Sequence, residues 1–213
     1  MNHSLRLPLS VRLAGSLVVV VGGGNVGLRK ARTLSAAGAA VRIVDPLPKP
    51  DSAEASWEWI QAEFVADHLT GASLVVLAAN QAVNSLAAIA ARERGLWIAD
   101  AVSPERGNVH FPAVGRRGRL TLSVDTDGAA PSLAIRLRDE WLSTLGDDFA
   151  AWLDLLLDVR REVRAVLDDT NDRQALTAEF AQDHWRQVFS RHGAEPVRQA
   201  LAARLRELQS RPK

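Results

Sequence analysis

The sequence predicts an α/β protein that combines a Rossmann-like parallel sheet with a short β-rich region and a C-terminal helical domain. Three observations support this fold class. Strand and helix signals alternate as far as Pro112, a glycine-rich turn joins the first strand to the first helix, and helical periodicity continues from Pro131 to the C-terminus. We therefore expect three parts, at residues 1–112, 113–146 and 147–213.

The composition is that of a globular protein. Of the 213 residues 47% are apolar and 24% are charged, and the net charge of +1 gives no global field that would attract nucleic acid or an anionic membrane. No apolar run approaches the roughly 18 residues of a membrane span, and the start MNHSLRLPLS lacks the apolar core of a secretory signal. Cysteine is absent, which excludes disulfides and thiolate ligands. We expect a cytoplasmic protein with no nucleic-acid or membrane partner.

The first strand, the first helix and the turn between them carry the strongest signal in the chain. An apolar run over 17–21 leads into Gly22-x-Gly24-x-x-Gly27, and good helix formers follow over 28–37. In this context the first glycine permits a sharp turn, the second lets a ligand approach the backbone, and the third allows close packing of helix on strand. The free N–H groups of the helix start then attract the pyrophosphate of a dinucleotide. The alternative is a glycine-rich turn that binds no ligand.

A second strand over 40–44 ends at Asp45, which lies 18 residues after Gly27. This is near the spacing of about 20 residues at which an acid binds the ribose hydroxyls of NAD. A carboxylate at this position repels a 2′-phosphate, so the sequence favours NAD over NADP. Arg42 and Lys49 lie close enough in the sequence to keep NADP as an alternative. The residues expected to contact the cofactor are Gly22, Gly23, Gly24, Asn25, Val26, Gly27, Asp45, Pro46 and Asn80.

The remaining elements of the first part alternate in the same way. Three prolines within 46–50 exclude a helix there, and the alternating segment 57–65 predicts a short strand. Segment 73–78 is a continuous apolar run, which is typical of a strand buried on both faces. A helix over 84–94 and a strand over 96–101 complete a parallel sheet, whose ligand is expected at the carboxyl ends of the strands.

Beyond Pro112 the pattern changes to antiparallel strands and helices. Segment 119–125 alternates polar and apolar residues, and the Arg-Arg-Gly sequence at 116–118 marks a turn before it. One strand pair and a few helices form a poor core by themselves, so 113–146 is expected to be a dimerisation region that buries its apolar face in a homodimer. The helices of this half are expected over 132–145, 147–167, 172–191 and 196–208.

Several motifs together resemble those of one enzyme family. They are GGGNVGLRKA at 22–31, Ala78-Ala79-Asn80 with Asn84, GNVHFPA at 107–113, RRGRL at 116–120 and SVDTDGAAP at 123–131. In order and spacing these motifs are similar to those of the precorrin-2 dehydrogenases of siroheme synthesis, which include the amino-terminal module of the fused siroheme synthase. The likeness covers nearly the whole chain.

The resemblance implies an NAD-dependent oxidation of precorrin-2 to sirohydrochlorin on a homodimer, and some members of the family also insert iron to give siroheme. Because this substrate is a polycarboxylate, arginines and helix-start amides suit its binding. Thr126 stands where some fused relatives carry a serine that can be phosphorylated. The expected substrate contacts are Asn108, Arg116, Arg117, Arg119, Thr126 and Gly128.

One position departs from the family pattern and bears on catalysis. Members that both oxidise and insert metal carry an aspartate two residues before a proline, and the corresponding residue here is Val102, before Pro104. Asp100 and His110 remain as candidate catalytic residues. For each there is a purely structural alternative. Asp100 is then a polar residue at a strand end, and His110 is a packed loop residue. The missing carboxylate argues against metal insertion more than against oxidation, and no metal site is expected.

Three functions are open at this point. The first is an NAD-dependent precorrin-2 dehydrogenase without efficient metal insertion, and this is the function we expect. The second is a bifunctional dehydrogenase and ferrochelatase in which Asp100 or His110 replaces the missing aspartate. The third is a non-catalytic NAD-binding redox sensor whose helical part contacts a partner. Mixed charges along the helical part argue against a DNA-binding face.

Overall fold

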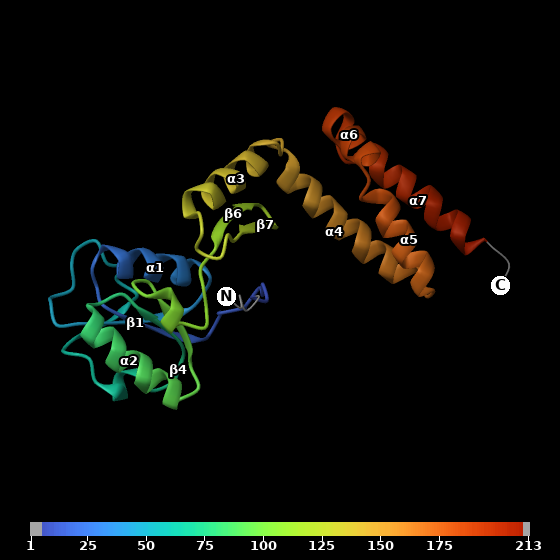
Figure 1. Cartoon of the computed structure of the whole chain (residues 1–213). Coiled ribbons are helices and arrows are strands. Elements are labelled where there is room, and N and C mark those ends of the chain that lie inside the picture. The colour runs from blue at the N-terminus through green and yellow to red at the C-terminus, as the bar shows by residue number, and fades with distance from the viewer. Residues whose placement is uncertain (1–5, 211–213) are drawn as a thin grey trace. The chain divides into compact units, whose positions relative to one another are not determined.

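The computed structural model describes residues 6–210 and divides the chain between Phe111 and Pro112 into two compact units, each described here by itself (Figure 1). The first unit ends one residue before the predicted boundary at residue 112. The second unit contains both the region 113–146 and the helices that follow it. The separation of that unit into a dimerisation region and a helical domain therefore stays a prediction.

The first unit is built on a five-stranded sheet in which all neighbouring strands are parallel. The strand order is β3-β2-β1-β4-β5, so the chain reverses its direction of travel across the sheet between β1 and β4. This is the order of a Rossmann sheet, and it confirms the predicted fold class. The strands are β1 Leu17–Val21, β2 Ala40–Asp45, β3 Glu58–Gln61, β4 Ala72–Leu77 and β5 Trp97–Asp100.

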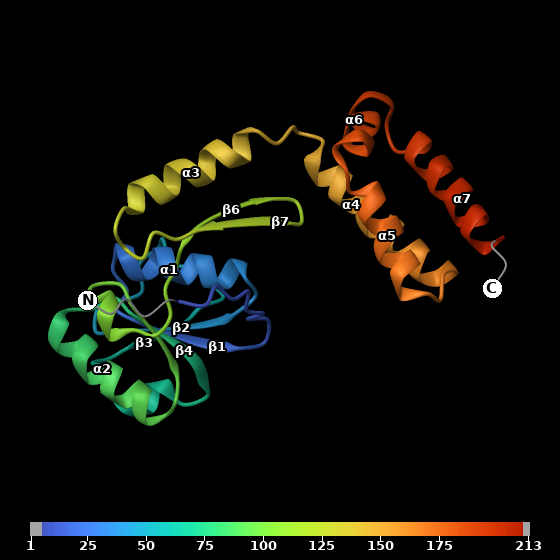
Figure 2. The ribbon, with the colours of Figure 1, turned by 45° about the vertical axis from the view of Figure 1, so that its right-hand side comes forward.

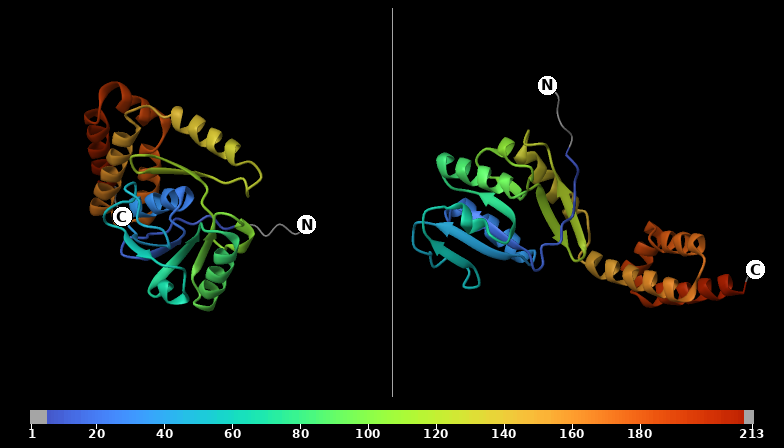
Figure 3. Two further views of the ribbon diagram at one scale, coloured as in Figure 1. Left: turned by 90° about the vertical axis from the view of Figure 1, so that its left-hand side faces the viewer. Right: turned by 90° about the horizontal axis from the view of Figure 1, so that it is seen from below.

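Helices α1 (Asn25–Ala36) and α2 (Gln81–Glu93) cover opposite faces of this sheet (Figure 2, Figure 3). The valines of β1 alternate between the faces, as side chains of a strand must. Val18 and Val20 pack on the α1 side of the sheet. Val19 and Val21 pack on the α2 side, and all four are at most 1% exposed. Burial on both faces explains why β1 and β4 appear in the sequence as continuous apolar runs.

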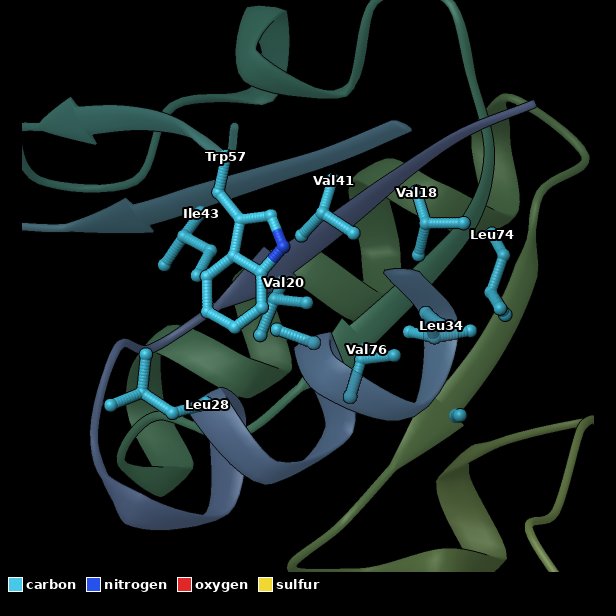
Figure 4. Close-up of a cluster of buried hydrophobic side chains, with 11 residues drawn as sticks. Val18, Val20, Leu28, Leu34, Val41, Ile43, Trp57, Leu74 and Val76 are labelled. Atoms are coloured by element: carbon cyan, nitrogen blue, oxygen red, sulfur yellow. The ribbon is translucent and has the colours of Figure 1, made fainter. Parts of the chain in front are cut away.

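The core under α1 consists of branched aliphatic side chains and one large aromatic ring. Figure 4 shows Trp57 among the strand side chains, with Leu28 and Leu34 entering from α1. Full burial of such side chains stabilises the fold by about 1.5–3 kcal/mol each. Because β1 and α1 are both anchored in this core, the glycine turn between them is held at the carboxyl edge of the sheet.

Both helices of the first unit begin earlier than the sequence predicts. Helix α1 begins at Asn25 rather than at residue 28, because Gly24 already has the extended conformation of an N-cap. Helix α2 begins at Gln81 rather than at residue 84, because the side chain of Asn80 accepts a hydrogen bond from the Val83 N–H at 3.0 Å. Such an N-cap satisfies one of the free donors of the first turn and fixes where the helix starts. Two short 3-10 helices, η1 (Ala66–Leu69) and η2 (Pro104–Arg106), precede β4 and follow β5.

The second unit opens with an antiparallel hairpin. Strands β6 (Ala113–Arg117) and β7 (Leu120–Val124) pair around a turn at Gly118, which has a φ of +56°. The predicted strand at 119–125 is therefore present and has β6 as its partner. Helix α3 (Pro131–Ser143) lies against the hairpin, and its side chains approach Gly115 so closely that a Cβ there would lie 2.2 Å from Leu142.

The second unit ends in four helices around one apolar core, α4 (Phe149–Val166), α5 (Thr170–Phe180), α6 (Asp183–His192) and α7 (Glu195–Gln209). The single helix expected over 172–191 is wrong, because the chain is extended at Gln182 and divides that segment into α5 and α6. The division lets the fully buried Phe180 stack on Trp185 at 4.8 Å between ring centroids. Within the described residues no helix has both the length and the apolarity that a membrane crossing requires.

Candidate functional site

The turn after β1 requires glycine at its first and last marked positions. Gly22 has a φ of +104°, and a Cβ on it would lie 2.7 Å from the backbone of Ala78 at the end of β4. A Cβ on Gly27 would lie 1.9 Å from the Gly22 carbonyl oxygen. The first glycine therefore serves the sharp turn from β1 into α1, which passes close to the backbone after β4, and the last serves the close approach of α1 to that turn.

Gly24 has a different role, because nothing lies within 4 Å of the position that its Cβ would occupy. Its φ of −72° is accessible to any residue, so the fold itself does not require glycine here. The open space faces the start of α1, whose N-cap makes no side-chain hydrogen bond and whose first turn contains no acidic residue. Helix-start N–H groups without a side-chain partner bind anions. The turn thus has the room and the donors that a pyrophosphate needs.

Asp45 is the last residue of β2 and is fixed beside this turn. Its Oδ2 accepts a hydrogen bond from the Gly23 N–H at 2.6 Å, and its Oδ1 accepts one from the Leu47 N–H at 2.8 Å. Trp59 on β3 packs against the same turn, since a Cβ on Gly23 would lie 2.3 Å from its ring. Each carboxylate oxygen keeps a further lone pair, so Asp45 can also accept hydrogen bonds from ribose hydroxyls.

A pocket of about 250 Å³ opens at this edge of the sheet. Of the predicted cofactor residues Gly22, Gly24, Asp45, Pro46 and Asn80 line it, whereas Gly23, Asn25, Val26 and Gly27 lie in the adjoining turn and the start of α1. The opposite wall comes from residues 62–64, after β3. This wall was not predicted from the sequence, because the loop has no glycine pattern and only its position after a strand indicates it.

Arg42 and Lys49, the two cations that made NADP an alternative cofactor, have hydrogen-bond partners outside the pocket. The Arg42 guanidinium donates to Glu58 at 2.9 Å and to the carbonyls of His68 and Thr70. The Lys49 ammonium donates to the carbonyls of Ala55 and Trp57. Neither side chain lines the pocket, and the described lining contains no lysine, arginine or histidine. A 2′-phosphate beside Asp45 would therefore meet a carboxylate and no lining cation.

Two asparagines shape the loop after β4. Asn80 uses its side-chain oxygen to cap α2, so this oxygen is already engaged at the pocket. Asn84 is completely buried, and its amide side chain bonds both the N–H and the carbonyl of Ala79, at 3.0 and 3.1 Å. The pair holds residues 78–80 against the glycine turn.

Asp100, one of the two predicted catalytic residues, ends β5 with a fully buried side chain. Its Oδ1 accepts hydrogen bonds from the N–H groups of Val102 and Ser103, both at 2.8 Å. Its Oδ2 lies 3.3 Å from Arg106 Nε and has no hydrogen bond within the described chain. Arg106 in turn donates to Ser103 Oγ at 2.7 Å. In this arrangement the carboxylate orders the loop after β5, while the Val102 side chain at the loop tip is 56% exposed.

The segment after η2 closes the edge of the sheet. Asn108, expected at the substrate, accepts a hydrogen bond from the Ile98 N–H at 2.8 Å and so acts as a partner to the edge strand. His110, the other predicted catalytic residue, is half-buried between Val109 and Phe111, which pack on the core under α1. The Lys30 ammonium lies 4.2 Å from the centre of the Phe111 ring, and burial together with Arg29 lowers the pKa of this lysine.

The other predicted substrate residues belong to the second unit. Arg117 donates to the carbonyls of Leu145 and Gly146, and Arg119 binds Asp154 at 2.6 Å, so both tie the hairpin to the start of α4. Thr126 accepts a hydrogen bond from the Ala130 N–H at 3.2 Å in the turn before α3. The remaining two are more open: Arg116 is exposed without a partner among the described residues, and Gly128 has a φ of +79° with free space around it.

A metal site does not emerge from the part of the chain that the structure covers. The described residues contain no group of three or more His, Cys, Asp or Glu side chains placed to hold a metal ion. The buried carboxylate of Asp100 faces the guanidinium of Arg106 rather than a second side chain that could bind a metal ion.

Comparisons with known proteins agree with this geometry. A family model described as "Putative NAD(P)-binding" matches residues 9–113. Siroheme synthase 2 of Aeromonas salmonicida is 37% identical over 171 residues, covering 79% of this chain and 36% of the relative. Siroheme synthase of Pseudomonas paraeruginosa is 31% identical over 209 residues, covering 94% of this chain and 43% of the relative. The chain thus spans well under half the length of these curated relatives.

A solved structure extends the likeness to the second unit. The structure of SirC, a precorrin-2 dehydrogenase, matches with a TM-score of 0.77 and 25% sequence identity, and the match covers 93% of this chain and all of that one. The motifs, the order of the strands and the siroheme synthase relatives point the same way. In sequence and in fold the chain resembles the precorrin-2 dehydrogenase family.

Proposed function

We propose that this protein oxidises precorrin-2 to sirohydrochlorin with NAD as the hydride acceptor, and that it does not insert metal efficiently. One observation carries the proposal. An open glycine turn, a helix start with free N–H groups and a fixed carboxylate meet at one pocket, whose described lining contains no cation. This set suits a dinucleotide with an unphosphorylated ribose, and the relatives named above supply the substrate class.

The chain's own residues bind and orient the cofactor. The start of α1 and the space at Gly24 receive the pyrophosphate, and Asp45 accepts hydrogen bonds from the adenosine ribose. The carboxyl ends of β1 and β4, where the order of the sheet reverses, would hold the rest of the dinucleotide. When bound, NAD would accept the hydride. The protein would position the cofactor against the substrate and exclude competing reactions.

The oxidation releases a proton as well as a hydride, and the proposal assigns the proton to water or to His110. The Asp100 side chain is fully buried beside Arg106 and already accepts two backbone hydrogen bonds. We therefore assign to it the structural role of ordering the loop after β5, and not proton transfer. Positioning of an electron-rich substrate against the cofactor can carry much of the rate enhancement. Among the arginines expected at the substrate, Arg116 is exposed and without a partner in the described chain, so its guanidinium is available to bind a carboxylate.

Weak metal insertion is inferred from two features of the loop after β5. Val102 occupies the position of the family's aspartate and presents an exposed apolar side chain. The nearest carboxylate, Asp100, is enclosed by its own loop. A group that removes pyrrole protons while a metal enters is therefore not presented at this position.

The proposed partner is a second copy of the chain. Helix α3 and strand β6 expose Val114, Leu133, Ile135 and Trp141, the last with 63% of its surface accessible. Several exposed apolar side chains on one helix and its hairpin support an interface with a second copy, which would remove them from water. The compartment expected from the composition is the cytoplasm.

The proposal is tested by spectra of purified protein with precorrin-2. With NAD present, we expect NADH absorbance and the sirohydrochlorin spectrum to rise together, and we expect NADP to support much slower turnover. Addition of ferrous or cobaltous ion should give metallated product no faster than the protein-free control. Fast metallation would favour the bifunctional enzyme, and tight NAD binding without turnover would favour the redox sensor.

A further inference from the structure

The wall formed by residues 62–64 is fixed by contacts that extend to η1. The Ala62 N–H donates to the Ile60 carbonyl at 3.0 Å, which turns the chain sharply after β3. The Val65 N–H donates to Nδ1 of His68 at 3.2 Å, and the His68 ring meets the Phe64 ring edge-on at 6.2 Å between centroids. The wall is thus held in place before any ligand binds.

Three polar side chains line the pocket, and two of them are already engaged. Both oxygens of Asp45 accept backbone hydrogen bonds, and the proposed function gives its remaining capacity to the ribose. The oxygen of Asn80 caps α2. Glu63 is exposed and forms no hydrogen bond or ion pair with any residue that the structure describes. Among the polar side chains that line the described pocket, Glu63 alone has carboxylate oxygens that accept no hydrogen bond.

The lining matches one part of a dinucleotide. Leu47, Phe64 and Val83 supply apolar surface for the faces of a flat ring system. The lining extends from the glycine turn and the loop after β4 to residues 45–47 and 62–64, at the ends of β2 and β3. That last part is the adenosine side of the pocket if Asp45 binds the ribose. Adenine carries an amino group at C6 whose two hydrogens are donors, and a carboxylate only accepts hydrogen bonds.

We propose that Glu63 is a specificity-determining residue that accepts a hydrogen bond from the C6 amino group of the adenine ring. This inference rests on the proposed function in taking NAD as the ligand of the pocket. It assigns the recognition of the base to Glu63, whereas Asp45 recognises the sugar. A site built to accept from an amino group rejects an analogue that presents an acceptor at the same place, because two acceptors then face each other.

The test compares NAD with nicotinamide hypoxanthine dinucleotide, which has a carbonyl oxygen in place of the amino group. Binding of each oxidised dinucleotide is measured by calorimetry, without substrate. We expect the wild-type protein to bind the analogue about tenfold more weakly than NAD. In Glu63→Gln the ratio should fall to within about twofold, because a side-chain amide both accepts and donates.

Glu93→Gln is the matched control, since Glu93 is an exposed glutamate at the far end of α2 and does not line the pocket. It should keep the wild-type ratio. Glu63 has no partner in the described structure, so its variant should melt at the wild-type temperature.

Each other outcome overturns a defined part of the account. Equal binding of both dinucleotides to the wild type, or an unchanged ratio in Glu63→Gln, rejects the assignment of Glu63. An unchanged ratio with tighter NADP binding in the variant would place the carboxylate beside the ribose 2′ position instead. If neither dinucleotide binds the wild type, the proposed function fails, and the assignment fails with it.

Discussion

At the scale of single residues, some glycines of the turn are required by the fold, whereas Gly24 is not. Gly22 and Gly27 are required by the protein itself, because a Cβ on either would meet backbone atoms. Gly24 is surrounded by open space and has a φ that any residue can adopt. A glycine that the fold does not need supports the proposal that a ligand approaches the chain at this position.

This difference predicts the effect of Gly24→Asp. The variant should fold normally, because its side chain enters free space, but its carboxylate would lie against the pyrophosphate at the start of α1. Like charges placed together at a binding site cost several kcal/mol, so we expect NAD affinity to fall by about 100-fold or more. Calorimetry measures the affinity, and thermal melting checks the fold.

Thr33→Asp provides the comparison, since it adds a negative charge to an exposed position further along the same helix. It should bind NAD nearly as the wild type does. Retained binding in Gly24→Asp would show that the anion does not lie over the turn.

At the scale of elements, the sequence predicted the parts of the fold that depend on local chemistry. The strand β1, the glycine turn and Asp45 could be read from order and spacing, because each position requires a particular residue type. The break between α5 and α6 could not, because the segment contains no glycine or proline there. The break accompanies the stacking of Phe180 on Trp185 across it, which no residue type in the segment signals.

The candidate site was predictable to a similar limit. The glycine turn and the position of Asp45 follow from a sequence pattern, whereas the wall at 62–64 depends on which strand ends lie side by side. The engagement of Asp100 by its own loop, and of Arg117 by the carbonyls before α4, depends on side-chain geometry that no spacing reveals. Sequence alone therefore suggested ligand roles for groups that the fold already uses.

The helical elements of the second unit are joined by a charged contact whose pH dependence can be predicted. Asp148, at the start of α4, accepts hydrogen bonds from Arg186 at 2.7 Å and from Ser190 at 2.6 Å, both on α6. These bonds hold the pKa of Asp148 well below its ordinary value. A carboxyl whose pKa is lowered by folding contributes stability above its unfolded value of about 4, and the contribution is lost as pH falls toward the folded value.

Arg186→Met should accordingly lower the free energy of unfolding in urea by about 1 kcal/mol at pH 7, after allowance for solvent screening. The difference from the wild type should shrink as the pH falls below about 4. Arg161→Met removes a more exposed arginine, 3.8 Å from Asp158, and should have a smaller effect. A difference that stays constant down to pH 2 would show that the contact does not act through its charge.

At the scale of the whole molecule, the proposed partner is a second copy of the chain. The exposed apolar side chains of α3 and β6 are proposed to pack against a second copy. Trp141→Glu should therefore convert a dimer into a monomer in light scattering at micromolar concentration, with an unchanged circular dichroism spectrum, because the side chain is largely exposed within the chain.

Trp97→Glu tests whether any exposed tryptophan would act in this way, since Trp97 is 40% exposed at the start of β5 in the first unit. This variant should remain dimeric. A monomeric wild type, or a dimer that survives both Trp141→Glu and the double change with Ile135→Glu, would remove α3 from the interface.

The most direct test of the account is the stoichiometry of a single reaction. Purified protein, precorrin-2 and NAD are combined without metal or any other enzyme, and NADH and sirohydrochlorin are followed together by their absorbance. The account predicts one NADH for each sirohydrochlorin, with the rate lost in Gly24→Asp. Sirohydrochlorin formed without NADH, or no product from protein that binds NAD, would contradict it.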